Sequence, residues 1–318
     1  KSDLAKLEAI ANLSPEDILN AVENKDLREV LGSLPPWENG EALPPLSQNW
    51  AEQTEALAAF HKKSGYGLFA NYAAFEWRDH ALSPISATDP IQLSDLKNYE
   101  LQRSQVVDNT ESFVCGLPAN NVLLYGDRGT GKSSTIHAIL NAYKGQGLRM
   151  IEIPKSAVEE LSLIREYLAD SPMKFIIYID DLSFDSQDNA FTELKAALEG
   201  GLSACQPNTL IYATSNRRHL IKENFSDRED DVNKNDTRQE QLSLSDRFGL
   251  TITFINPDKK DYLDIVEKIA ADRGLQVDAQ RLDAAAEQWA VRRGGRSPRC
   301  ARQFIDHVES ALRRGKEW

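Results

Sequence analysis

The chain has 318 residues, 41% of them hydrophobic and 27% charged, which is typical of a globular protein long enough for about two domains. No apolar run approaches the roughly 18 residues of a membrane-spanning helix, so we expect no membrane partner. The formal net charge of −12 argues against a nucleic-acid-binding surface that covers the whole protein. The three cysteines are widely spaced and form no C-x-x-C pair, which favours a reducing, cytoplasmic location.

Residues 1–90 are predicted to form a mostly helical N-terminal region. The run Ser-Pro-Glu-Asp at 14–17 is a typical helix start, with a capping hydroxyl, a proline in the first turn and two acidic residues. Two Pro-Pro pairs in residues 34–46 predict an extended linker, and a second helix is expected over 49–63. The aromatic-rich segment 66–77 fits either the core of a small helical module or a partner-docking surface, and both interpretations stay open.

Residues 91–256 alternate between strand patterns and helix patterns. Strands are expected at 122–125, 149–153, 174–180, 209–215 and 250–255, and helices at 133–143, 155–169 and 189–198. This alternation predicts an α/β domain built on a five-stranded parallel sheet with helices on both faces. Ligands of such folds bind at the carboxyl ends of the strands.

Two further segments complete the predicted organisation. Residues 223–245 are rich in charged and amide side chains and almost free of aliphatic ones, so we expect a mobile insertion there. Residues 257–318 show only helical periodicity, which predicts a lid of three helices. This lid ends in a locally basic stretch, 290–318, that is suited to nucleotide phosphates or to an external polyanion.

The sequence Gly-Asp-Arg-Gly-Thr-Gly-Lys-Ser follows the first expected strand and fits the phosphate-loop pattern G-x-x-x-x-G-K-[ST]. Its glycines can adopt backbone angles closed to other residues, so that successive N–H groups turn toward a polyphosphate at a helix N-terminus. Lys132 is predicted to reach the β- and γ-phosphates, and the Ser133 hydroxyl to complete a Mg²⁺ shell. The expected nucleotide contacts are Gly126, Asp127, Arg128, Gly129, Thr130, Gly131, Lys132, Ser133 and Ser134.

The apolar strand 174–180 ends in two carboxylates, Asp180 and Asp181. A carboxylate at the end of a strand beside a phosphate loop is the Walker B arrangement, in which Asp180 would hold the Mg²⁺ shell. Asp181 would polarise the attacking water as a general base. The alternative, a strand that leads into a solvated turn, is disfavoured because the phosphate loop precedes this strand by some fifty residues.

Two later stretches, LIYATSN at 210–216 and SDRFG at 245–249, together with the helical tail, make the segment from about 93 to 312 resemble the AAA+ ATPase superfamily. The resemblance implies that Asn216 is the sensor-1 residue that orients the hydrolytic water. It implies that Arg247 is an arginine finger offered to ATP in a neighbouring subunit, and that Arg299 is the sensor-2 arginine.

Each of these roles has a competing interpretation. Asn216 could be a turn cap, with Thr214 or Ser215 as the sensor instead. Arg247 could be a surface salt-bridge residue, and Arg299 has Arg296 and Arg302 as rivals.

The same resemblance places adenine between the linker before the phosphate loop and the helical tail. Leu96 and Tyr99 are the expected contacts in that linker. Packing of both side chains within the linker is an equally good interpretation of the sequence.

A narrower resemblance rests on PANNVLLYGDRGTGKSS, IDDLSF, IYATSNRRHL, SLSDRFGL, ARQF and the earlier GYGLFANYAAFEW. These runs are similar to the bacterial AAA+-type ATPases known only as domain of unknown function 815. The likeness extends over most of the chain and implies ATP or ADP and Mg²⁺ as ligands. It implies no cellular role.

We therefore expect a Mg²⁺-dependent ATPase that couples hydrolysis to domain motion in a homo-oligomer, with Arg247 acting in trans. The second hypothesis is an ATP-gated binding module for a protein or DNA partner, resembling a helicase loader, in which hydrolysis is slow or incidental. The ending Asp180-Asp181, where most AAA+ proteins have Asp-Glu, is compatible with both hypotheses and predicts slow turnover. A metabolic kinase is a weaker interpretation, because it leaves the sensor and finger residues unexplained.

Overall fold

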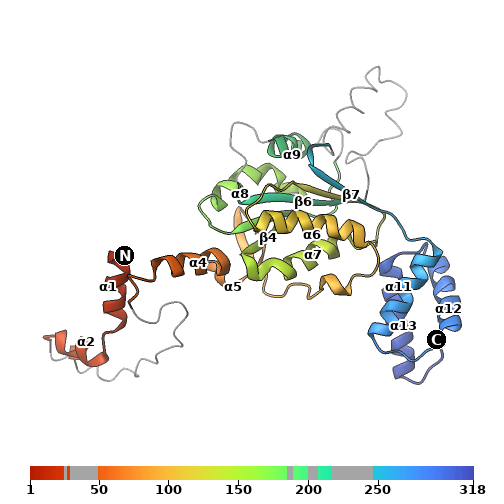
Figure 1. The fold of residues 1–318 in the computed structure, drawn as a ribbon, viewed down its shortest axis with the longest axis horizontal. Coiled ribbons are helices and arrows are strands. Elements are labelled where there is room, and N and C mark those ends of the chain that lie inside the picture. The colour runs from red at the N-terminus through yellow and green to blue at the C-terminus, as the bar shows by residue number, and fades with distance from the viewer. Residues whose placement is uncertain (25–26, 29–48, 185–188, 200–206, 217–245) are drawn as a thin grey trace, which may run out of the picture. The chain divides into compact units, whose positions relative to one another are not determined.

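The structure is a computed structural model that describes residues 1–24, 27–28, 49–184, 189–199, 207–216 and 246–318 (Figure 1). The chain divides into two compact units, Lys1–Tyr66 and Gly67–Trp318. The expected linker at 34–46 and the expected insertion at 223–245 lie outside the described residues.

The first unit is helical, as predicted. It contains α1 (Ser2–Ala11), α2 (Pro15–Ala21) and α4 (Thr54–Ser64). The start of α2 is the predicted one, because the Ser14 side chain accepts from the Asp17 N–H while the Asp17 carboxylate accepts from the Ser14 N–H. The helix expected over 49–63 begins five residues later than predicted, at Thr54.

The second unit is built on the expected parallel sheet. Its strands are β3 (Val122–Gly126), β4 (Leu148–Glu152), β5 (Lys174–Ile179), β6 (Thr209–Ser215) and β7 (Leu250–Phe254). They lie in the order β4-β5-β6-β3-β7, with every neighbouring pair parallel. The strand that enters the phosphate loop therefore lies between the strands that end in Ser215 and Phe254.

Two strands that we did not expect extend this sheet to seven. β1 (Ala74–Arg78) runs parallel to β4, and β2 (Ala81–Pro84) returns antiparallel to β1. The prediction of a helical region up to residue 90 was wrong for these two strands, because their backbone hydrogen bonds come from pairing with each other and with β4. Phe75 and Trp77 are both buried on one face of the sheet. The sheet thus begins before residue 91, where we expected the nucleotide domain to start.

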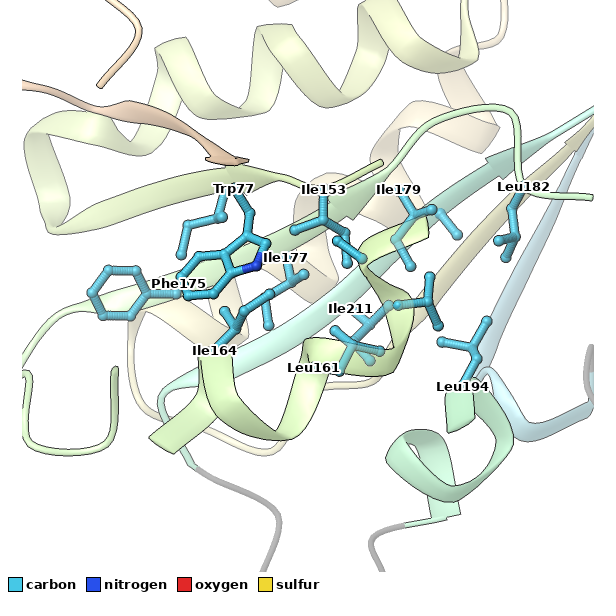
Figure 2. Packing of buried hydrophobic residues seen from close by; sticks show 14 of the residues in the cluster. Trp77, Ile153, Leu161, Ile164, Phe175, Ile177, Ile179, Leu182, Leu194 and Ile211 are labelled. Atoms are coloured by element: carbon cyan, nitrogen blue, oxygen red, sulfur yellow. The ribbon is translucent and has the colours of Figure 1, made fainter. Parts of the chain in front are cut away.

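Helices cover both faces of the sheet (Figure 1). On β5, Phe175, Ile177 and Ile179 pack in one apolar cluster, whereas Ile176 and Tyr178 belong to another on the opposite face. The first cluster includes side chains of α8 (Leu161–Leu168) and α9 (Asn189–Glu199). Figure 2 shows part of it, where side chains of α8 and α9 meet those of the central strands. The second cluster includes side chains of α6 (Glu100–Val114) and α7 (Lys132–Tyr143).

The C-terminal lid consists of the three expected helices, α11 (Lys259–Asp272), α12 (Ala279–Arg292) and α13 (Pro298–Arg313). The side chains of Asp258, Asp278 and Ser297 cap their N-termini, each accepting from a backbone N–H three residues later. These helices share their own apolar core, in which Tyr262 and Ile305 are fully buried. None of the helices in the described part of the chain is long and apolar enough to span a membrane.

Candidate functional site

The phosphate loop connects the end of β3 to the start of α7. Gly126, Gly129 and Gly131 have positive φ angles of 129°, 78° and 98°, and Gly131 is the N-cap of α7. Such angles are open to glycine and strained for other residues. The loop therefore turns its backbone into the N-terminus of a helix, where N–H groups and the helix dipole favour an anion.

Gly126 is also packed against the neighbouring strand, which makes it the most demanding position in the loop. A Cβ atom there would overlap the backbone carbonyl of Phe254 in β7. We expect Gly126→Ala to lower the free energy of unfolding by about 2–4 kcal/mol, through strain and steric overlap. Gly145→Ala is the matched control, since a Cβ at Gly145 meets nothing within 4 Å. Equal urea midpoints for the two variants would contradict this account of Gly126.

Lys132 is the first residue of α7, and its side chain folds back over the loop. Its Nζ donates to the carbonyl oxygens of Gly126 at 2.9 Å and Asp127 at 2.7 Å. Desolvation lowers the pKa of Lys132, although the nearby carboxylates of Asp127, Asp181 and Asp180 oppose this shift. The loop thus holds a buried ammonium group beside its own backbone, where a phosphate could accept from it.

Asp180 lies at the end of β5 and accepts three hydroxyl hydrogen bonds on one carboxylate oxygen. The donors are Ser133 Oγ at 2.8 Å, Tyr178 OH at 2.6 Å and Thr214 Oγ1 at 2.5 Å. Burial raises the pKa of Asp180, but these hydrogen bonds outweigh burial and hold the pKa below its usual value. The contact between Ser133 and Asp180 joins a hydroxyl and a carboxylate, which are the hard oxygen ligands that Mg²⁺ prefers.

Asp181 follows in a left-handed conformation with φ of 49°, which costs about 1–2 kcal/mol for a residue other than glycine. Its N–H donates to Thr214 Oγ1 at 2.9 Å, and its carboxylate accepts from Asn216 Nδ2 at 2.5 Å. The Oδ1 atom of Asn216 accepts from Lys132 Nζ at 3.3 Å. Asn216 therefore bridges the phosphate loop and the carboxylate expected to act as the base.

The lid contacts the phosphate loop directly, which the sequence did not predict. The Arg299 N–H, in the first turn of α13, donates to the Gly129 carbonyl at 3.1 Å. A Cβ on Gly129 would lie 3.0 Å from the hydroxyl of Ser297 and 3.2 Å from the Cβ of Arg299. The N-terminus of α13 therefore packs on the loop, so two helix N-termini border the same site.

A cavity of about 480 Å³ lies between these elements. Its lining residues are Leu96, Arg128, Gly129, Gly131, Lys132, Ser133, Ser134, Asp180, Asp181, Thr214, Asn216, Pro298, Arg299 and Arg302. The cations Arg128, Lys132, Arg299 and Arg302 thus face two carboxylates across one space. Such a set suits a polyanion that is bound together with a metal ion.

A smaller cavity of about 40 Å³ adjoins the first and shares Leu96, Gly131, Pro298 and Arg302 with it. Its other walls include Tyr99 and Thr130 and, from α11 of the lid, Ile265 and Ile269. Tyr99 is engaged in packing as well, because its hydroxyl donates to the Ile255 carbonyl at 2.7 Å. The linker and the lid therefore meet beside the phosphate loop, where the adenine was expected.

Two of the predicted loop residues serve the loop itself. The Asp127 N–H donates to the Phe254 carbonyl at 2.8 Å, and its carboxylate accepts from the Asn256 N–H at 2.7 Å. The Thr130 hydroxyl donates to the Asp127 carbonyl at 2.8 Å. The first two bonds join the phosphate loop to the end of β7, and the third stabilises the turn of the loop itself.

Arg247 lies away from the other predicted site residues. It lies three residues before β7. The first residue of β7, Leu250, pairs with Val122 at the start of β3, whereas the phosphate loop follows the end of β3. At about 3.3 Å per residue, a strand of this length separates the two ends by roughly 15 Å. Arg247 is accordingly not among the residues that line the two cavities.

The structure also separates the three candidate arginines of the lid. Arg296 donates two hydrogen bonds to the Glu287 carboxylate, from Nε at 2.9 Å and from Nη2 at 2.8 Å. Arg296 lines neither cavity. Arg299 and Arg302 both line the large cavity, one helical turn apart on α13.

The main residue that sequence reasoning missed is Tyr178, which donates to Asp180 from within β5. The sequence did contain a signal for this contact, because side chains two residues apart on a strand point to the same face, as Tyr178 and Asp180 do.

These elements define the class of the protein. A phosphate loop between β3 and α7, two carboxylates after β5, a parallel sheet in the order β4-β5-β6-β3-β7 and a helical lid form a P-loop NTPase fold of AAA+ type. The family model described as "Protein of unknown function (DUF815)" matches residues 70–312, so the chain belongs to that family.

Comparison with solved structures gives distant matches. Thermotoga maritima RuvB, described as a Holliday junction branch migration motor, is 16% identical with a TM-score of 0.47, over 70% of this chain and 65% of that chain. The FIGL-1 AAA domain in complex with ADP is 17% identical with a TM-score of 0.47, over 71% of this chain and 75% of that chain. The match therefore spans less than two thirds of RuvB. No curated protein matches the chain.

Proposed function

We propose that this protein is a Mg²⁺-dependent ATPase that hydrolyses ATP at the interface between identical subunits and couples the cycle to movement of its lid. The observation that carries this proposal is the bridge through Asn216, which contacts Lys132 of the phosphate loop and Asp181 of the strand end. A site that only bound Mg²⁺ and ATP would need Asp180 but no second carboxylate held beside the phosphate loop.

The residues present fit the substrate and the metal. The glycine turns and the four cations of the large cavity suit a triphosphate, and Leu96 and Tyr99 border the space left for adenine. Ser133 and Asp180 would hold Mg²⁺, which when bound neutralises charge that develops between the phosphoryl groups. Lys132 would exchange its two carbonyl partners for phosphate oxygens.

Asp181 is the proposed general base. Its carboxylate would take a proton from the attacking water, and Asn216 would hold both the carboxylate and the water in position. The left-handed backbone of Asp181 stores strain at this point, as is common at functional sites. Arg299, with Arg302 beside it, would bind phosphate oxygens from the lid side.

Arg247 is the proposed arginine finger. Because it lies at the opposite end of β3 from the phosphate loop, it is badly placed to reach a nucleotide in its own subunit. A neighbouring copy in a head-to-tail assembly would supply it instead. We also propose a cytoplasmic location, in keeping with the free, exposed thiol of Cys115.

Phosphate release across a protein dilution series tests this arrangement. The rate per chain should rise with concentration, because a site shared between subunits forms only on assembly. Arg247→Ala should bind ATP as the wild type does and lose about 10³-fold in turnover at every concentration. Arg292→Ala, at the exposed end of α12, is the matched control. A rate per chain that stays constant on dilution would contradict the shared site.

A second function deserves a test because of one observation. The proposed base, Asp181, has a side chain one methylene shorter than the glutamate of most AAA+ proteins, which favours slow turnover and a protein that acts through ATP occupancy. In that case ATP binding alone would switch a surface for a protein or DNA partner. Retention on DNA that weakens steeply with salt and requires ATP but not hydrolysis would favour this function.

A further inference from the structure

A third cavity, of about 200 Å³, lies behind the Walker B strand and takes no part in the proposed hydrolysis. Its walls come from β1, the segment after β2, α7, β4 and β5. Leu140 and Met150 are among its apolar walls, and the polar side chains that line it include Asp89, His137, Glu152 and Tyr178. The cavity exists because the two unexpected strands extend the sheet past β4.

Negative charge dominates this cavity. Asp89 and Glu152 bring two carboxylates, and the imidazole of His137, 3.8 Å from Asp89, forms an ion pair with it only when His137 is protonated. Desolvation raises the pKa of Glu152, and the charges of Asp180 and Glu76 add to this effect, while His137 opposes it. Glu152 and Asp89 are nevertheless exposed at the mouth of the cavity, so a cation from solvent can reach both carboxylates.

The described residues that line the cavity include too few acidic and imidazole groups for a metal site built from protein side chains alone. Among the described residues, no three His, Cys, Asp or Glu side chains are close enough to hold one. A cavity of this volume exceeds the space of a single ion or water. Carboxylates that face a partly apolar space fit an organic cation with a short carbon chain.

Tyr178 connects the cavity to the candidate ATP site. Its ring forms part of the cavity wall and meets His137 edge-on at 5.9 Å, while its hydroxyl donates to Asp180 at 2.6 Å. A ligand in this cavity would therefore touch a residue that is bonded to the proposed Mg²⁺ ligand. Its positive charge would also act on Asp180 through space.

We propose that this cavity binds a small aliphatic amine, with an ammonium group against Glu152 and Asp89 and carbon atoms against Leu140 and Met150. Bound amine weakens the hold of Asp180 on Mg²⁺, because two cations then compete for the same negative field. This second effect rests on the proposed ATPase function, whereas binding of the amine does not.

Calorimetric titration with 1,4-diaminobutane, in the absence of nucleotide, tests the site. We expect saturable binding to the wild type and none of 1,4-butanediol, the neutral molecule of similar shape. Glu152→Gln should weaken binding about tenfold, as expected for the loss of one charged partner. Glu166→Gln, on the exposed side of α8, should leave binding unchanged. Ala87→Phe should abolish binding by filling the cavity.

No saturable binding, equal binding of the diol, or binding that both Glu152→Gln and Ala87→Phe leave unchanged would overturn the proposal. Since nucleotide is absent, none of these outcomes depends on whether the protein hydrolyses ATP.

A second experiment measures hydrolysis. The amine should raise the Mg²⁺ concentration for half-maximal rate about twofold in the wild type. The Glu152→Gln variant, titrated with the same amine, controls for direct binding of the amine to ATP and should show no such change.

Discussion

Lys132→Ala is expected to weaken ATP binding about 100-fold or more and to abolish measurable hydrolysis. The Lys132 ammonium is buried beside the phosphate loop, where it already makes two hydrogen bonds of 2.9 and 2.7 Å to backbone carbonyls. Charge-assisted bonds to phosphate oxygens would replace them, and their loss costs about 3 kcal/mol. Calorimetric titration with ATP and Mg²⁺ measures the affinity.

Lys144→Ala is the matched control for this prediction. Lys144 follows the same helix at its other end, where its Nζ donates to Asn141 Oδ1 at 3.3 Å on the exposed surface. This variant should bind ATP as the wild type does. Affinity of Lys132→Ala within about threefold of the wild type would show that the phosphate loop is not where the triphosphate binds.

Asp181→Asn is expected to keep ATP affinity within a few-fold of the wild type and to lose 10²- to 10⁴-fold in turnover, roughly the contribution of a general base. Asparagine tolerates the left-handed backbone at this position, so the substitution removes the base without disturbing the fold. Its amide can still meet Asn216, which keeps the bridge to Lys132 in place. Single-turnover phosphate release separates the chemical step from binding.

Asp170→Asn, in the exposed turn after α8, is the control for a lost carboxylate elsewhere in the same domain. It should hydrolyse ATP at the wild-type rate. An unchanged rate in Asp181→Asn would show that another group takes the proton from water. Glu152 is a poor substitute, because its place is in the third cavity behind β5.

Much of the nucleotide domain could be predicted because its signals are local. Residues 175–179 of β5 are apolar without interruption because they are buried on both faces, and such a run is recognisable without knowing its neighbours. The glycines of the phosphate loop indicate positions where the backbone needs angles that other residues avoid, and all three have positive φ angles in the structure. The order of strand, loop and helix then follows from chain order alone.

Other features depend on pairings between distant segments and could not be predicted in this way. β1 was misassigned because a short run of aromatic residues fits a helical module as well as an edge extension, and only its pairing with β4 decides. The contact of Arg299 with Gly129 joins residues 170 positions apart. Its existence depends on how the lid packs, which no local pattern records. The third cavity, behind β5, likewise forms only where β1, the segment after β2 and α7 come together beside β4 and β5.

In the proposed shared site, Lys132 and Arg247 act on the same ATP molecule from two different subunits. Phosphate release by an equimolar mixture of Lys132→Ala and Arg247→Ala chains tests it most directly. Each variant alone should be inactive, but in the mixture an Arg247→Ala subunit binds ATP and a Lys132→Ala neighbour supplies the arginine. Random assembly makes about one interface in four complete, so we predict roughly a quarter of the wild-type rate. A mixture as inactive as its two components would contradict the shared site.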